Sequence, residues 1–137
     1  MAHPTRNGSR REFGFTLVEL MIVMAIIVIL IGIAVPYYQK SIIRAKESVL
    51  RTNLFTLRQV IDEYSYDRQR APQQLQDLVT DGYVRSVPID PMTGSNQTWQ
   101  TVNEDPTTAA DPNQAGIFDV RSGSDKTSLD GTPYADW

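Results

Sequence analysis

The chain has 137 residues, among them 13 basic residues, 16 acidic residues, one histidine and no cysteine, so neither a disulfide nor a thiolate metal site holds the fold together. Once a membrane segment is subtracted, about 100 residues remain, enough for one small domain. Residues 15–137 carry 10 basic and 15 acidic groups. This balance excludes a general nucleic-acid binder, because phosphate binding needs clustered cations.

An apolar segment follows a basic stretch at the N-terminus. Arg6, Arg10 and Arg11 precede residues 15–35, in which Glu19 is the sole charged residue. At about 1.5 Å per residue, a helix of this length spans a bilayer core of about 30 Å. The arginines predict a cytoplasmic N-terminus and a domain across the membrane. A cleaved signal peptide or a simple anchor is the alternative. However, the segment runs into Val35-Pro36 without a small-x-small cleavage site, so we expect the helix to be retained.

Glu19 lies in this otherwise apolar span, where an unpaired charge costs about 3 kcal/mol or more. Cleavage between Gly14 and Phe15 would supply a cation, the new α-amino group of Phe15, on the same helix or on a neighbouring one. The helix macrodipole also favours a carboxylate near the N-terminus. The alternative is a Glu19 side chain that reaches the lipid headgroups.

The apolar periodicity continues beyond the membrane segment. Apolar residues recur at three- and four-residue steps, the spacing of one helix face: Ile42, Ala45, Val49, Phe55 or Leu54, Leu57, Ile61 and Tyr64. We expect one helix from residue 15 to about residue 66, with a transmembrane part at 15–36 and an amphipathic continuation at 37–70. Gly32 and Pro36 predict a kink or local melting, because glycine lowers helix propensity and an interior proline removes a hydrogen bond.

The remaining residues, 71–137, predict a small globular domain. Residues 72–79 predict a short helix that begins at a proline. Residues 98–102 and 116–121 predict two short strands, and residues 103–115 have the composition of a loop. The expected fold class is α+β, a long helical spine with a small antiparallel sheet and loops.

The run Gly14-Phe15-Thr16-Leu17-Val18-Glu19, followed by the apolar stretch and Pro36, resembles the type III signal of prepilins and pseudopilins. The resemblance implies that a prepilin peptidase removes a cytoplasmic leader, residues 1–14, and that Phe15 is N-methylated. It also implies assembly into a helical filament. Thr16 and Glu19 belong to the assembly motif, in which Glu19 neutralises the Phe15 amine of an adjacent subunit.

The C-terminal half resembles one branch of this superfamily, the G-type major pseudopilin of type II secretion. The resemblance rests on Asp67-Arg68, Arg70-Ala71-Pro72, Gly82-Tyr83, Asp90-Pro91 and the ending Asp130-Gly131 through Asp136-Trp137. It implies an inner-membrane protein with a periplasmic domain, whose homopolymeric filament helps to drive protein export across the outer membrane. The implied partners are minor pseudopilins and an inner-membrane platform. Two alternatives remain, a major type IV pilin for adhesion, motility or DNA uptake, and a monotopic receptor with an inert anchor.

Residues 124–136 include Asp125, Asp130 and Asp136 together with several hydroxyl groups. Such oxygen donors suit calcium. The spacing is not that of an EF-hand, however, and a solvated, turn-rich loop explains the same residues. G-type pseudopilins bind calcium in the corresponding loop. The resemblance therefore implies one calcium ion, held by these three carboxylates with carbonyl oxygens of Ser128 or Leu129.

The sequence contains no recognisable catalytic constellation. Its single histidine, His3, lies in the predicted leader, and it has no cysteine, no glycine-rich phosphate loop and no HExxH motif. A nucleophile with a base, or a metal-bound water, has no candidate residues. We therefore expect no enzymatic activity.

Overall fold

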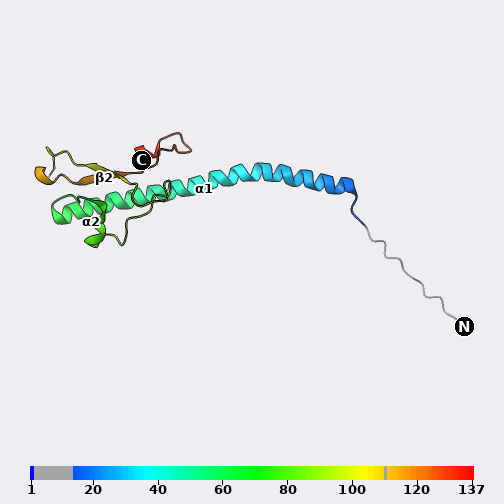
Figure 1. The fold of residues 1–137 in the computed structure, drawn as a ribbon, viewed down its shortest axis with the longest axis horizontal. Helices are drawn as coiled ribbons and strands as arrows, with labels where there is room; N and C mark the ends of the chain where they lie inside the picture. The colour runs from blue at the N-terminus through cyan, green and yellow to red at the C-terminus, as the bar shows by residue number, and fades with distance from the viewer. Residues whose placement is uncertain (2–13, 110) are drawn as a thin grey trace. The chain divides into compact units, whose positions relative to one another are not determined.

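A computed structural model describes residue 1 and residues 14–109 and 111–137, with elements in the order α1, α2, β1, η1, β2, η2 (Figure 1). The predicted leader, residues 1–14, falls almost wholly outside these described residues. The chain forms two compact units, Met1–Tyr38 and Gln39–Trp137. The boundary between the units lies inside α1, the 52-residue helix Leu17–Arg68.

Helix α1 begins at a side-chain cap. The Oγ1 atom of Thr16 accepts a hydrogen bond of 3.2 Å from the backbone N–H of Glu19, which satisfies one of the donors left open at a helix start. Helix α1 then continues through Gly32 and Pro36 without interruption, so the predicted local melting is absent. Pro36 lacks only its own N–H, whose acceptor would be the carbonyl of Gly32, and the glycine backbone adapts readily to the proline ring.

The first unit presents apolar side chains outward. By length and composition, α1 is the one helix among the described residues that is able to cross a membrane, and none of its most apolar window is buried within the chain. Large contiguous apolar surface is rare on soluble monomers and marks an interaction surface or a lipid-facing segment. These side chains are therefore covered by something other than their own chain.

The second unit builds its core on one face of α1. Figure 1 shows α2, Leu75–Thr80, and β2, Ile117–Arg121, beside the C-terminal part of α1. The core residues outside α1 are Leu78, Trp99, Ile117, Val120 and Tyr134. Strands far apart from α1 in sequence thus cover a single amphipathic helix, as expected for a small α+β domain.

The buried face of α1 differs at its start from the predicted face. Val49 and Ile42 are 49% and 40% exposed, and Leu54 rather than Phe55 enters the core. Leu57, Ile61 and Tyr64 are buried, as predicted. The buried residues of α1 keep steps of three and four residues: Glu47, Leu50, Leu54, Leu57, Val60, Ile61 and Tyr64.

The two predicted strands form an antiparallel pair. Strand β1, Gln100–Asn103, pairs with β2 so that Thr101 lies opposite Val120, with an irregularity at Val102/Asn103. After β2 the chain passes so close to the segment that precedes β1 that a Cβ atom on Gly123 would overlap the carbonyl oxygen of Thr98. Only glycine fits at this close approach.

Helix α2 begins three residues later than predicted, at Leu75 instead of Pro72. The Asp77 carboxylate explains the difference, because it accepts hydrogen bonds of 3.0 and 3.1 Å from the backbone N–H groups of Gln73 and Gln74. These bonds hold the two residues outside the helix and cap its start.

Candidate functional site

The first candidate site is the junction that precedes α1. Gly14 and Phe15 lie outside regular secondary structure, and Phe15 is 81% exposed. A Cβ atom on Gly14 would meet no atom of the described residues within 4 Å. The peptide bond between the two residues is therefore sterically open to a processing enzyme.

Glu19 lies in the first turn of α1, three residues after the capping Thr16. This threonine–glutamate spacing is that of a capping box, so Thr16 fixes the backbone that carries Glu19. The apolar neighbours Leu17, Val18 and Leu20 are each more than half exposed. Within residues 14–109 and 111–137, the structure records no ion pair of the Glu19 carboxylate. The chain thus presents one exposed carboxylate on an exposed apolar helix.

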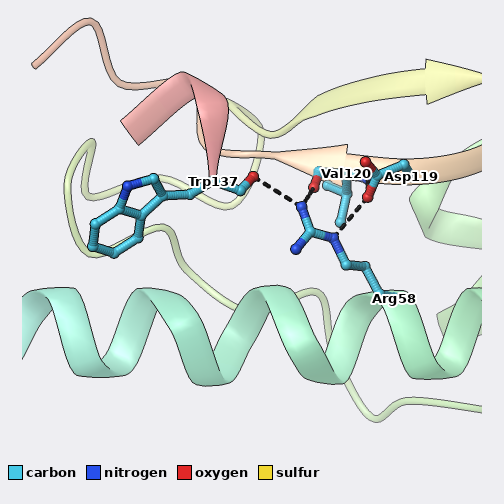
Figure 2. A network of polar contacts seen from close by, with 4 residues as sticks. All are labelled: Arg58, Asp119, Val120 and Trp137. Atoms are coloured by element: carbon cyan, nitrogen blue, oxygen red, sulfur yellow. Dashed lines mark hydrogen bonds and ion pairs between the residues drawn. The ribbon is translucent and has the colours of Figure 1, made fainter. Parts of the chain in front are cut away.

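A second cluster anchors the last 16 residues, 122–137, here called the tail. Figure 2 shows Arg58 of α1 reaching β2 and the tail through one guanidinium group. Its Nε donates to Asp119 Oδ1 at 2.7 Å, and its Nη2 donates to the main-chain oxygens of Val120, at 3.0 Å, and Trp137, at 2.8 Å. The planar fork of arginine suits several acceptors at once.

Asp90 anchors the start of the tail from another direction. Its carboxylate is fully buried and accepts the Ser122 hydroxyl at 2.6 Å and the Gly123 N–H at 3.3 Å through Oδ2. Its Oδ1 accepts the Met92 N–H at 2.8 Å, closing an Asx turn. A buried charge with three donors is compensated by hydrogen bonding.

Glu47 provides the third anchor, on the buried face of α1. One carboxylate oxygen, Oε1, accepts the Leu129 N–H and the Tyr134 hydroxyl, each at 2.9 Å. Burial, together with this neighbouring carboxylate, raises the pKa of Tyr134 to about 12. Glu47 is therefore a buried acceptor around which the tail is arranged.

The predicted calcium ligands are not assembled. Asp125, Asp130 and Asp136 are exposed, and among the described residues no three acidic, histidine or cysteine side chains gather at one point. The Ser128 carbonyl already accepts the Gly131 N–H at 3.0 Å. The residues present thus do not fit the predicted carboxylate-rich calcium site, and calcium binding itself remains a prediction.

Sequence reasoning missed Glu47, Arg58 and Asp90 as tail anchors. The sequence contains one signal for Glu47. It is a charged residue three positions before Leu50, on a helix face that is otherwise apolar. The other partners lie far along the chain, 61 residues apart for Arg58 and Asp119 and 32 for Asp90 and Ser122. Helical periodicity carries no information on such pairs.

Comparison with known proteins identifies both an N-terminal motif and relatives that share it. A family model described as the prokaryotic N-terminal methylation motif matches residues 9–35. The type II secretion system core protein G of Klebsiella michiganensis is 31% identical, over 96% of this chain and 92% of that protein. The core protein G of Pseudomonas aeruginosa is 31% identical over 60% of this chain and 69% of its own length.

Similarity to a pilin is more local. The type IV major pilin PilA of Myxococcus xanthus is 55% identical, but over 34% of this chain and 21% of that pilin. No solved structure gives a significant match. The full-length similarity therefore lies with the core protein G group.

Proposed function

The chain belongs to the family of type II secretion system core protein G and is a pseudopilin subunit, and from this we propose that its processed form, beginning at Phe15, polymerises through residues 15–36. The resulting homopolymeric filament helps to drive protein export. A structural subunit of this kind acts by assembly and has no catalytic centre.

The observation that carries this proposal is the exposed apolar surface of α1 in the first unit. A lipid bilayer covers such a helix before assembly, and neighbouring copies cover it in a filament. Helices in both environments associate through close packing of apolar side chains. One surface thus serves both membrane anchoring and polymerisation.

Glu19 supplies register in this proposal. A carboxylate between helices in an apolar environment requires a cation at the same depth. The α-amino group of a cleaved Phe15 lies four residues earlier in the chain, so a neighbour displaced along the filament axis offers it to Glu19. Thr16, which caps α1, fixes the helical turn that carries Glu19.

The proposed membrane orientation and the proposed partners are those of a pseudopilin subunit. The arginines of the leader place the N-terminus in the cytoplasm, and the second unit then lies in the periplasm. A prepilin peptidase, minor pseudopilins and an inner-membrane platform complete the set of proposed partners.

Mass spectrometry of the protein isolated from membranes tests the processing step. The expected mature chain begins at Phe15 and carries one methyl group on its α-amine. A Gly14→Leu variant, which places a bulky side chain at the open junction, should retain its leader. A wild-type protein with Met1 at its terminus, or a chain cut beyond Val35, would contradict the proposal.

A type IV pilus subunit is the second candidate, supported by the local similarity to the Myxococcus xanthus pilin. Deletion of the gene separates the two functions. Loss of an exported protein from the medium supports the pseudopilus, whereas loss of adhesion, motility or DNA uptake with normal export supports the pilus.

A further inference from the structure

Glu47 combines a buried position with a charged side chain. The residue is 8% exposed, and a carboxylate removed from water is costly unless donors compensate it. Two donors converge on its Oε1, the Leu129 N–H and the Tyr134 hydroxyl. Because both donors belong to the tail, the burial of Glu47 is coupled to the conformation of the tail.

The tail forms a closed loop at this point. The backbone at Thr127 pairs with that at Pro133 in an antiparallel bridge. The Ser128 N–H donates to the Thr132 carbonyl at 2.8 Å. The turn between them needs Gly131, which has a φ of 86° and so lies in the region that favours glycine. The loop itself is thus hydrogen-bonded across its base, and its N–H at Leu129 is directed to Glu47.

This polarity is the reverse of what a cation requires. A calcium site turns carbonyl and carboxylate oxygens toward one centre, whereas residues 129 and 134 direct donors toward a carboxylate. Lys40, Arg44 and Arg51 line one cavity together with Glu47, Leu129 and Asp130. Three cationic side chains beside two carboxylates leave this cavity with a net positive charge, which disfavours a divalent cation there.

The outer end of the tail is fixed without carboxylates. The Arg51 guanidinium lies 4.4 Å from the centre of the Trp137 ring, and Trp137 Nε1 donates to Thr132 Oγ1 at 2.9 Å. The Tyr134 and Trp137 rings meet edge to face at 5.1 Å. These contacts hold the end of the tail against Arg51 of α1.

We propose that the Glu47 carboxylate, rather than a calcium ion, holds residues 127–134 in place, which makes Glu47 the positioning residue of the tail. In this arrangement an anion on α1 gathers backbone and side-chain donors of the loop. The proposal concerns the second unit alone and holds whether or not the chain polymerises.

The first test compares the full chain, in detergent micelles, in excess calcium and in EDTA. The expected melting temperature of the second unit is the same in both solutions, and deuterium exchange of the Leu129 amide is equally slow. Asp130→Asn should leave both readouts unchanged. A higher melting temperature and slower Leu129 exchange in calcium, both lost in Asp130→Asn, would overturn the proposal.

The second test removes the carboxylate. Exchange of the Leu129 amide in Glu47→Ala should be faster by roughly tenfold or more, the effect of losing hydrogen bonds to a charged acceptor. Glu63→Ala, which removes an exposed glutamate from the same helix, is the matched control and should exchange as the wild type does.

Two milder variants keep the test decisive if Glu47→Ala does not fold. Tyr134→Phe removes one donor, and Glu47→Gln keeps the side-chain size and one acceptor oxygen but removes the charge. Each should accelerate Leu129 exchange, whereas Tyr66→Phe, at an exposed tyrosine, should not. Unchanged exchange in both Tyr134→Phe and Glu47→Gln would refute the role of Glu47.

Discussion

The two units of the chain use the same residue types in opposite ways. Leu30 in the first unit is 60% exposed, whereas Leu50 in the second is fully buried. Each leucine gains about 1.5–3 kcal/mol when it is covered, but only Leu50 obtains that gain from its own chain. The first unit is therefore completed by lipid or by other copies, and the second by internal packing.

Charged residues show the same contrast. Glu19 is exposed in the isolated chain, while Glu47, Asp90 and Asp119 each accept hydrogen bonds from within the second unit. Substitutions in the first unit should therefore change assembly and leave stability intact. Substitutions in the second unit should mainly change the free energy of unfolding.

The largest expected effect is the loss of filaments in Glu19→Leu. Without the carboxylate, the Phe15 amine of a neighbouring subunit would be buried unpaired, at a cost of about 3–5 kcal/mol. Electron microscopy and cross-linking should find no filaments, while the melting temperature of the second unit stays at the wild-type value.

Glu19→Asp is the matched control, because it keeps a carboxylate in the first turn of α1. It should assemble better than Glu19→Leu. Normal filaments from Glu19→Leu would contradict the pairing, and a lowered melting temperature would contradict the separation between the two units.

The next largest effect concerns the core of the second unit. Leu50→Ala should lower the free energy of unfolding by about 2–5 kcal/mol, since it leaves a cavity beneath the sheet and tail. Val49→Ala, at the neighbouring exposed position, should change it by less than about 0.5 kcal/mol. Denaturant titration of the full chain in detergent measures both, and equal losses would show that the observed helix register is wrong.

A smaller effect is expected at the Arg58 network (Figure 2). Arg58→Ala removes three hydrogen bonds, but the side chain is 39% exposed, so solvent screening limits the loss to about 1–2 kcal/mol. Lys46→Ala, at an exposed cationic residue on the same helix, is the control and should be nearly neutral. In a double-mutant cycle, Arg58 and Asp119 should be coupled, and additive losses would argue against their contact.

The elements that the sequence predicts well are those encoded by local patterns. The long helix follows from apolar residues at three- and four-residue steps, and both strands follow from short alternating runs. The start of the buried stripe was misplaced because Ile42 and Val49 are apolar but face outward, where neighbouring copies or lipid can cover them. The local sequence pattern cannot distinguish apolar residues that pack in the core of their own chain from apolar residues that face outward.

The tail could not be predicted for a different reason. Its acidic residues predict a cation site, whereas its hydrogen bonds to α1 at Leu129 and Tyr134 are made with Glu47, which lies 82 and 87 residues away. Pro36 shows the same limit, since its context in a continuous helix overrides its usual effect. For the tail the deciding partner is distant in sequence, and for Pro36 it is the glycine one helical turn earlier.

The smallest expected effect is a loss of stability at alkaline pH that depends on Tyr134. Burial, with the Glu47 carboxylate beside it, raises the pKa of Tyr134 to about 12 in the folded chain, whereas an unfolded tyrosine ionises near pH 10. Below about pH 10 the phenol is protonated in both states, and its contribution is fully present. Between about pH 10 and 12 the unfolded state releases the proton while the folded state keeps it, so stability falls as pH rises, by at most about 1.4 kcal/mol per pH unit.

Tyr134→Phe separates this contribution from other alkaline effects. Burial also raises the pKa of Tyr64, so the wild type loses stability through more than one group. The difference between wild type and Tyr134→Phe should shrink from pH 9 to pH 11 in denaturant titrations, because the phenol that favours the folded state ceases to do so. Tyr66→Phe, which removes an exposed hydroxyl, is the matched control. A wild-type advantage over Tyr134→Phe that is constant from pH 9 to 11 would show that the Tyr134 hydroxyl ionises equally in both states, and hence that it does not donate to a buried Glu47 carboxylate.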